Sequence, residues 1–308
     1  MRYFVTGASG WIGSAVVPEL LRAGHEVVGL ARSDASATVL AAAGAEAHRG
    51  SLDDLDSLRA AADSSDGVIH LAFKHELAFT GDFLGAADAD RRAVELFGDV
   101  LAGSDRPLVI ASGVLGLSQG PAATEEDGHG AQPSTERFGA GPETRRVTAE
   151  LVRSFAERGV RSCVLRLPPT VHGTGDNGFM ATIVATARER SASGYIGDGS
   201  QRWPAAHVLD VARLFRLAVE NAPAGSTLHG VAEEGVAIRD VAEVIGRHLA
   251  VPVVSVPPEA ARAHFTWMAD FLSRDSPTSS AQTREQMGWQ PTQLGLVDDL
   301  DLGHYFAS

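Results

Sequence analysis

The stretch that decides the fold is residues 1–21, MRYFVTGASGWIGSAVVPELL, at the start of the chain. An apolar run, RYFVT, leads into glycines at Gly7, Gly10 and Gly13, and an amphipathic run follows them. Small residues between a strand and a helix let the backbone approach a pyrophosphate, and the helix N-terminus offers it unpaired N–H groups. The stretch therefore predicts a strand, a tight turn and a helix that together bind a dinucleotide.

Composition narrows the class of protein. The chain has 308 residues, 44% of them hydrophobic, which suffices for one large α/β domain or for a large domain with a smaller lobe. Its net charge of -13 argues against nucleic acid or an anionic membrane as the main partner, because both require a basic face. No apolar run reaches the roughly 18 residues of a membrane span, and the strand-like run at Arg2 leaves no room for a signal peptide. We therefore expect a cytoplasmic protein.

Short β-branched runs alternate with longer helical patterns over the first 170 residues. Strands are expected at residues 2–6, 26–31, 45–49, 67–72, 107–112 and 160–167, the last with Cys163 buried in it. Helices are expected at residues 11–23, 53–62, 87–102 and 143–158. This alternation predicts an α/β fold with a doubly wound parallel sheet, a Rossmann fold, followed by a smaller C-terminal substrate lobe.

The pattern becomes irregular after residue 170, and this change suggests where the chain divides. We assign residues 1–174 and 205–231 to the dinucleotide-binding domain, and residues 175–204 and 232–308 to the smaller lobe. Residues 118–142, rich in glycine, proline and acidic residues, are expected to form a long surface loop. Such a loop is either a lid or plain solvated chain, and the sequence leaves both open.

The glycine spacing and four later segments resemble the extended short-chain dehydrogenase/reductase superfamily. TGASGWIG matches the TGxxGxxG of that superfamily, and GVIHLA, PLVIASGVLG, LRLPPTVHGTG and RWPAAHVLDVARLF match further segments in the same order. The resemblance implies a homodimer, built through the helices at 87–102 and 143–158. It also implies cofactor contacts at Gly7, Ser9, Gly10, Trp11, Ile12, Gly13, Ser51, Leu52, Leu71, Ala72, Ser112 and Pro168.

The end of the second strand favours NADP(H) as the cofactor. Enzymes that use NAD usually carry an acidic residue there to bind the ribose hydroxyls, whereas this chain has Ala31 and Arg32. A cation suits a 2′-phosphate, and Ser33 could add a hydroxyl contact. The alternative is that Arg32 is an ordinary surface arginine.

The catalytic motif of the superfamily is not intact. Its members carry Tyr-x-x-x-Lys on a helix, where the tyrosine transfers a proton. In GPETRRVTAELV, Pro142 falls at the tyrosine position and Arg146 at the lysine position, as in an atypical branch of the superfamily. Arg146 can hold the nicotinamide ribose, but it stays charged and cannot share a proton as a neutral amine does. A plain helix-surface charge is the alternative.

Other residues are candidates for catalysis. Ser112 ends its strand at the sheet edge where open α/β sheets bind ligands, although it could simply cap the strand. Lys74 and His75 follow the fourth strand at the same edge and are candidate proton donors, the alternative being solvated loop charges. Asp90 loosely matches an asparagine of the superfamily's proton relay, and surface pairing with Arg91 or Arg92 is the alternative.

Three residues are candidate substrate contacts: His172, Tyr195 and Trp203. For Trp203, packing around a turn is the alternative. The eleven histidines show no His-x-x-x-His spacing, so we propose no metal site.

Three functions stay open, and we favour the first. It is an NADP-dependent oxidoreductase that transfers hydride between nicotinamide and a small organic substrate, which would be a carbonyl, an enone or an imine. An NAD(P)-dependent epimerase or dehydratase would need an acid/base pair across the substrate, and the sequence offers none. A non-catalytic NADP-binding protein is the third.

Overall fold

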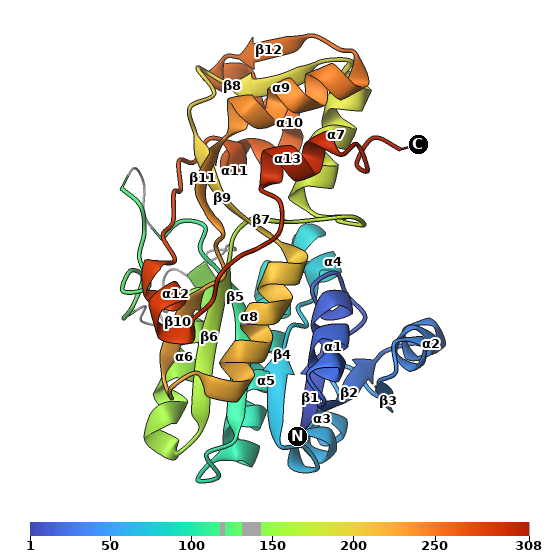
Figure 1. The fold of residues 1–308 in the computed structure, drawn as a ribbon, viewed down its shortest axis with the longest axis vertical. Helices are drawn as coiled ribbons and strands as arrows, with labels where there is room; N and C mark the ends of the chain where they lie inside the picture. Colours follow the sequence, from blue (N-terminus) through green and yellow to red (C-terminus); the bar gives the residue numbers. More distant parts are fainter. Residues whose placement is uncertain (118–120, 131–142, 308) are drawn as a thin grey trace.

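A computed structural model describes residues 1–117, 121–130 and 143–307 of the chain. Its centre is a seven-stranded parallel sheet with the strand order β10-β6-β5-β4-β1-β2-β3 (Figure 1). The strands are β1 (Arg2–Thr6), β2 (Glu26–Ala31), β3 (Glu46–Arg49), β4 (Gly67–His70), β5 (Pro107–Gly113), β6 (Arg161–Leu167) and β10 (Ser226–His229). The sheet confirms the predicted doubly wound α/β fold. Because its strands are parallel, their carboxyl ends share one edge.

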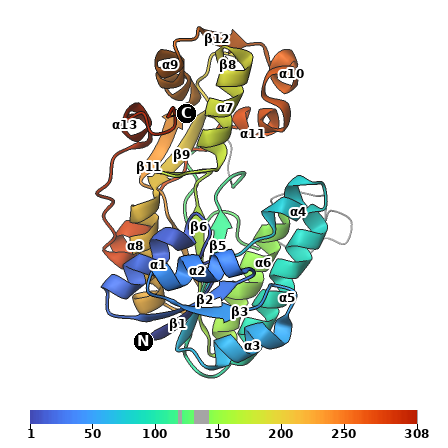
Figure 2. The same cartoon turned by 90° about the vertical axis from the view of Figure 1, so that its right-hand side faces the viewer.

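Helices cover both faces of this sheet, as Figure 2 shows. They are α1 (Gly13–Arg22), α2 (Asp34–Ala42), α3 (Leu55–Asp63), α5 (Phe83–Leu101), α6 (Glu143–Ser154) and α8 (Val208–Asn221), and a short helix, α4 (His75–Phe79), packs on α5. Helices α1 and α8 bury Leu20 and Phe215 on one face, and α3, α5 and α6 bury Leu58, Phe97 and Val152 on the other. Both faces of the strands are therefore covered, which explains why the strands read as continuous apolar runs.

The predicted elements agree with the structure except at their ends. Helix α5 begins at Phe83 rather than at residue 87, because the Asp82 side chain accepts a hydrogen bond from the Gly85 N–H and caps the helix. Helix α6 ends at Ser154, and a 3₁₀ turn over Phe155–Arg158 completes the segment expected to be helical. Strand β4 ends at His70, two residues earlier than expected.

The structure agrees with the predicted burial of Cys163 and shows no membrane-spanning helix among the described residues. Cys163 lies on β6 with no exposed surface, and burial raises the pKa of its thiol to about 12, so the thiol is protonated at neutral pH. Within the described part of the chain, no helix combines the length and the apolarity needed to cross a bilayer.

A smaller lobe lies beyond the carboxyl ends of the parallel strands (Figures 1 and 2). It contains a three-stranded sheet of β11 (Glu233–Ala237), β9 (Arg202–His207) and β7 (Thr170–His172), and a pair of β12 (Val253–Val256) and β8 (Ser193–Ile196). Its helices are α7 (Phe179–Arg190), α9 (Ile238–Leu249), α10 (Ala261–Phe265), α11 (Ala269–Leu272) and α13 (Leu296–Asp301). These elements enclose a hydrophobic core of their own, with Trp203 and Ile245 fully buried in it.

One segment assigned to the smaller lobe packs elsewhere. Helix α12 (Ala281–Met287) lies against α8 and β10, and Met287 and Trp289 belong to the core of the main sheet. The indole N–H of Trp289 donates to the carbonyl of Asp210 on α8 at 3.0 Å. The chain therefore returns to the main unit between residues 281 and 289 before α13 rejoins the lobe. Conversely, β7 and the end of β9, which were assigned to the dinucleotide-binding domain, join β11 in the sheet of the lobe. The rest of the division stays a prediction.

Part of the predicted long loop is anchored. In residues 121–130, Ala123 forms a parallel β-bridge with Thr278, and the Glu125 carboxylate accepts from the backbone N–H and the hydroxyl of Thr283. Residues 118–120 and 131–142, including Pro142, lie outside the described residues. Residues 121–130 are thus held by Thr278 and by Thr283 of α12.

The turn after β1 depends on two glycines for space. Gly7 has a positive φ of 66°, and a Cβ there would lie 2.8 Å from the backbone nitrogen of Ala72. A Cβ on Gly13 would lie 2.2 Å from the Gly7 carbonyl oxygen. Backbone atoms cannot yield to such contacts, so only glycine allows the turn to pack against the end of β4 and α1 to begin so close to it.

This packing predicts different costs for alanine at two glycines with positive φ. Gly24 has a φ of 83° and open space around its Cα, so Gly24→Ala should lower the free energy of unfolding by about 1 kcal/mol, from backbone strain alone. Gly7→Ala adds a backbone collision and should lower it by about 3 kcal/mol. Urea denaturation of both variants measures the difference, and equal losses would contradict the packing described.

Candidate dinucleotide and substrate site

Gly10 leaves an open surface at the tip of the glycine turn. A Cβ built on Gly10 would meet, among the described residues, only the Gly7 carbonyl oxygen at 3.2 Å. Helix α1 follows with no side-chain cap and no acidic residue in its first turn. A bare backbone beside an uncapped helix N-terminus suits an anion, because the N–H groups and the helix dipole both favour negative charge. The turn therefore has the form of a pyrophosphate site.

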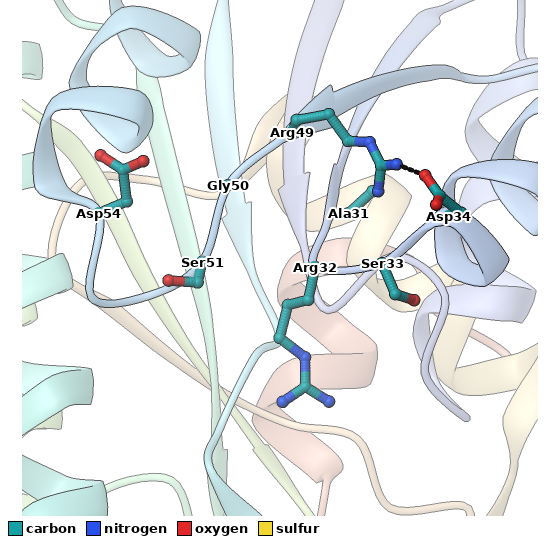
Figure 3. Close-up of a pocket in the computed structure, with 8 residues that line it drawn as sticks. All are labelled: Ala31, Arg32, Ser33, Asp34, Arg49, Gly50, Ser51 and Asp54. Atoms are coloured by element: carbon teal, nitrogen blue, oxygen red, sulfur yellow. Dashed lines mark hydrogen bonds and ion pairs between the residues drawn. The ribbon is translucent and has the colours of Figure 1, made fainter.

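An open pocket of about 410 Å³ lies at the carboxyl ends of β2 and β3 (Figure 3). It is lined by Ala31, Arg32, Ser33, Asp34, Arg49, Gly50, Ser51 and Asp54. Arg49 forms an ion pair with Asp34, whereas the Arg32 side chain extends away from that pair, is 69% exposed and lies 4.0 Å from Glu76. The sequence singled out Arg32 but not Arg49, which ends the neighbouring strand.

Three residues predicted to contact the cofactor, Ser33, Ser51 and Leu52, lie in or beside this pocket. Ser33 caps α2, where its hydroxyl accepts from the Ser36 N–H at 3.2 Å. The Ser51 hydroxyl accepts from the Asp53 N–H at 3.2 Å, and Leu52 is buried in the core. Each of these side chains thus has a structural contact that a cofactor would share or displace.

Trp11 connects the glycine turn to the smaller lobe. Its indole N–H donates to the Val171 carbonyl on β7 at 2.9 Å, and its ring faces Gly175, where a Cβ would lie 3.6 Å away. Ser9 is exposed at the turn, and Ile12 packs partly buried against the main core. Pro168 is buried just after β6, on the way to β7.

A buried hydrogen-bond chain supports the floor of the turn, where Leu71 and Ala72 follow β4. The Ala72 N–H donates to Thr6 Oγ1 at 3.2 Å, Thr6 Oγ1 bonds to His70 Nδ1 at 2.7 Å, and His70 Nε2 bonds to Asp90 Oδ1 at 3.1 Å. Asp90 is only 4% exposed, so the alternative of a surface pair with Arg91 or Arg92 is wrong. Its partner is His70, which lies on β4 behind the glycine turn.

Ser112 lies at the carboxyl end of β5, as predicted. It is 5% exposed, and its hydroxyl makes no hydrogen bond with any residue that the structure describes. The register of β4 with β5 ends at His70↔Ile110, so the backbone beyond Ile110 has no partner from β4. This hydroxyl is therefore available at the sheet edge where ligands bind in such folds.

The two candidate proton donors after β4 differ in their contacts. Lys74 Nζ lies 2.7 Å from both carboxylate oxygens of Asp53, which is in the loop after β3, so Lys74 forms an ion pair with Asp53. The ring of His75 contacts Phe73, with the ring centroids 5.1 Å apart. Desolvation and then the charge of Arg145 lower the pKa of His75, so the imidazole is mostly neutral at pH 7.

The side chains of two neighbouring arginines on α6, Arg145 and Arg146, bind different backbone carbonyls. Arg146, the predicted site residue, donates to the Gly116 carbonyl at 2.9 Å, in the loop after β5. Arg145 donates to the Ala111 carbonyl at 2.8 Å, and its guanidinium lies 4.6 Å from the centroid of the Phe73 ring. Arg145, which the sequence reasoning missed, is thus the arginine held beside Ser112.

The three predicted substrate contacts lie apart from this group. His172 is 1% exposed, and its Nδ1 bonds to Asp299 on α13 at 2.8 Å. Trp203 has no exposed surface in the lobe core, as the packing alternative expected. Tyr195 lies on β8 of the lobe, and the centroid of its ring is 4.9 Å from the Arg239 guanidinium. None of the three is brought together with Ser112, because β7, β8 and β9 direct these side chains into the lobe or toward its C-terminal segment.

Across the described ranges, no group of three or more histidine, cysteine or acidic side chains is arranged to hold a metal ion. The polar groups that converge near Ser112 are instead Arg145 and, beside it, His75.

Curated relatives span nearly the whole chain. An uncharacterized protein of Schizosaccharomyces pombe is 44% identical over 99% of this chain and 100% of its own length. An uncharacterized protein of Saccharomyces cerevisiae is 41% identical over 97% of this chain and 98% of its own length. A quinoline-oxide ketoreductase of Stigmatella aurantiaca is 27% identical over 85% of this chain and 78% of its own length.

Solved structures show the same fold at low sequence identity. The UDP-glucose 4-epimerase of Thermotoga maritima, solved with UDP-glucose, superposes with a TM-score of 0.75 at 20% identity, over 99% of this chain and 98% of that one. The UDP-glucose 4-epimerase of Thermus thermophilus, solved with NAD, has a TM-score of 0.71 at 18% identity, over 99% of both chains.

The family assignment rests on most of the chain. The sequence model of the NAD-dependent epimerase/dehydratase family matches residues 3–229, from β1 to the end of β10. This range contains the glycine turn, the pocket at the ends of β2 and β3, and Ser112. The protein belongs to the NAD-dependent epimerase/dehydratase family, within the extended short-chain dehydrogenase/reductase superfamily.

Proposed function

We propose that the protein is an NADP-dependent oxidoreductase that transfers hydride between nicotinamide and a small organic substrate. The observation that carries the proposal is the pocket at the ends of β2 and β3, where Arg32 and Arg49 stand and Ala31 replaces the acidic residue typical of NAD enzymes. When bound there, the cofactor would place its pyrophosphate on the glycine turn and supply the hydride for the reaction.

Charge supports NADP over NAD in this pocket. A 2′-phosphate could form charge-assisted hydrogen bonds with Arg32, whose side chain has only a distant contact with Glu76 at 4.0 Å. The N-terminus of α2 faces the same pocket and favours an anion. Arg49 would add a second cation once the phosphate competes with Asp34.

The reacting groups support hydride transfer over epimerisation. An epimerase needs an acid and a base on opposite faces of its substrate, whereas the carboxylates of Asp53 and Asp90 are bonded to Lys74 and His70. Ser112 can orient a substrate oxygen, and the similarity to a ketoreductase is consistent with this chemistry. A protein that binds NADP without turnover is the second candidate, because no tyrosine lies on α6.

Replacing Arg32 should separate the two cofactors. Arg32→Ala should raise the Kd of NADPH about 10-fold to 100-fold, since a charged hydrogen bond contributes about 1.5–3 kcal/mol, while the Kd of NADH should change less than about twofold. Fluorescence titration measures both constants. Arg59→Ala, which removes an exposed arginine of α3, is the control. Equal weakening of both cofactors would argue against a 2′-phosphate site at Arg32.

Cofactor consumption tests turnover. With a panel of carbonyl, enone and imine compounds, the wild-type protein should oxidise NADPH, followed by absorbance, and Ser112→Ala should reduce kcat about 100-fold by removing the donor to the substrate oxygen. The Kd of NADPH should change far less than kcat in this variant, because Ser112 is only one of the many contacts expected for the cofactor. Tight NADPH binding with no consumption across the panel would favour the non-catalytic protein, and interconversion of substrates without net consumption would favour an epimerase.

A further inference from the structure

Arg145 is held in a fixed position beside the candidate reaction site. Its guanidinium donates to the carbonyl of Ala111, the residue before Ser112, at 2.8 Å. The guanidinium also lies over the ring of Phe73, which follows β4, at 4.6 Å from the ring centroid. These contacts come from the ends of two adjacent strands of the central sheet, so Arg145 lies at the edge where the substrate is expected.

Among the residues that the structure describes, no acidic side chain forms an ion pair with Arg145. By contrast, Arg91 and Arg92 on α5 and Arg153 on the same helix α6 each have a carboxylate partner. Arg145 is also partly buried, and its charge helps to lower the pKa of the neighbouring His75. A partly buried cation that has no carboxylate partner among the described residues favours an incoming anion.

The chemistry of the guanidinium selects which anion fits. One N–H group is used on Ala111, and the remaining donors keep the fork geometry that binds a carboxylate. A fixed positive charge also opposes a protonated imine, because like charges repel, and it favours an oxygen that becomes negative as hydride is added. Of the three substrate types, the geometry therefore favours a carbonyl compound.

We infer that Arg145 binds a substrate carboxylate and that the substrate is a carbonyl compound with this carboxylate next to the reducible carbon, a 2-oxo acid. The inference rests on the proposed oxidoreductase function. Arg145 would hold the carboxylate while Ser112 donates a hydrogen bond to the adjacent carbonyl oxygen. The 2-oxo acid, NADPH and one proton become a 2-hydroxy acid and NADP⁺: a C–H bond forms from the hydride, the C=O electron pair moves to oxygen, and water supplies its proton.

Matched acids and esters test this assignment. Pyruvate and phenylglyoxylate are compared with their methyl esters, which keep the carbonyl and lose the charge. The wild-type protein should show a kcat/KM at least about 10-fold higher for the acids. Arg145→Leu should lower kcat/KM for the acids about 100-fold, and for the esters less than about threefold, because only the acids lose a charged contact. Arg145→Lys should restore part of the acid activity.

Two controls separate the substrate contact from a structural role. Arg153→Leu removes an equal charge from α6 and should leave the ratio of acid to ester activity unchanged. The Kd of NADPH should stay the same in Arg145→Leu and Arg145→Lys. A loss of acid and ester activity in equal measure, or a raised Kd for NADPH with an unchanged ratio, would overturn the inference and assign Arg145 to loop support or to the cofactor.

A binding measurement keeps this test separate from the test of turnover. In the complex with NADP⁺, phenylglyoxylate should raise the Tm of the wild-type protein and of Arg153→Leu, but not that of Arg145→Leu, and its methyl ester should raise none of them. This pattern without NADPH consumption would support the anion site and contradict the oxidoreductase. Absence of any shift in the wild-type protein would overturn the anion site, whether or not NADPH is consumed with other compounds.

Discussion

The rest of the structure depends on a backbone-to-backbone contact between the glycine turn and the end of β4. Gly7 packs so closely on Ala72 that a Cβ would lie 2.8 Å from its nitrogen, and the chain from Ala72 through Thr6 and His70 to Asp90 fixes that floor from below. Because β1 and β4 are held together in this way, α1 begins directly above the sheet edge with its N-terminus uncapped. The turn, the pocket beside β2 and Ser112 then line one edge of a single parallel sheet.

The protein has a net charge of -13, yet arginines stand at two separate places along this edge of the sheet. At one end, Arg32 and Arg49 line the pocket in which we propose that the 2′-phosphate of NADP binds. At the other end, Arg145 is fixed between the Ala111 carbonyl and Phe73, where the family's proton-donating tyrosine has no counterpart on the described helix. An arginine cannot donate a proton at neutral pH, but it can hold a carboxylate and stabilise a developing oxyanion. In the proposed reaction, electrostatic stabilisation and a proton from water therefore take the place of proton transfer from a tyrosine.

The sequence was sufficient for features set by local pattern and not for those set by distant partners. The doubly wound parallel sheet, the glycine turn and the position of Ser112 follow from periodicity and from the order of motifs, and the structure has them in place. The order of the strands in the sheet was not predicted. Arg145 was missed because a shift of one residue turns a helix position by about 100°, which alignment on a single glutamate does not resolve. The burial of Asp90 and the packing of the segment around Trp289 were not resolved, because their partners, His70 and Asp210, lie on other elements that only the folded chain brings near.

Transfer of the hydride itself is the most direct test of the central claim. The protein would be incubated with NADPH carrying deuterium at C4, and the products of the carbonyl panel would be analysed by mass spectrometry. The account predicts that one product gains a single deuterium at the former carbonyl carbon when the label occupies one of the two faces of the nicotinamide ring, and none when it occupies the other. If NADPH binds but no compound of the panel gains deuterium from either face, the claim that this family member is an oxidoreductase would be contradicted.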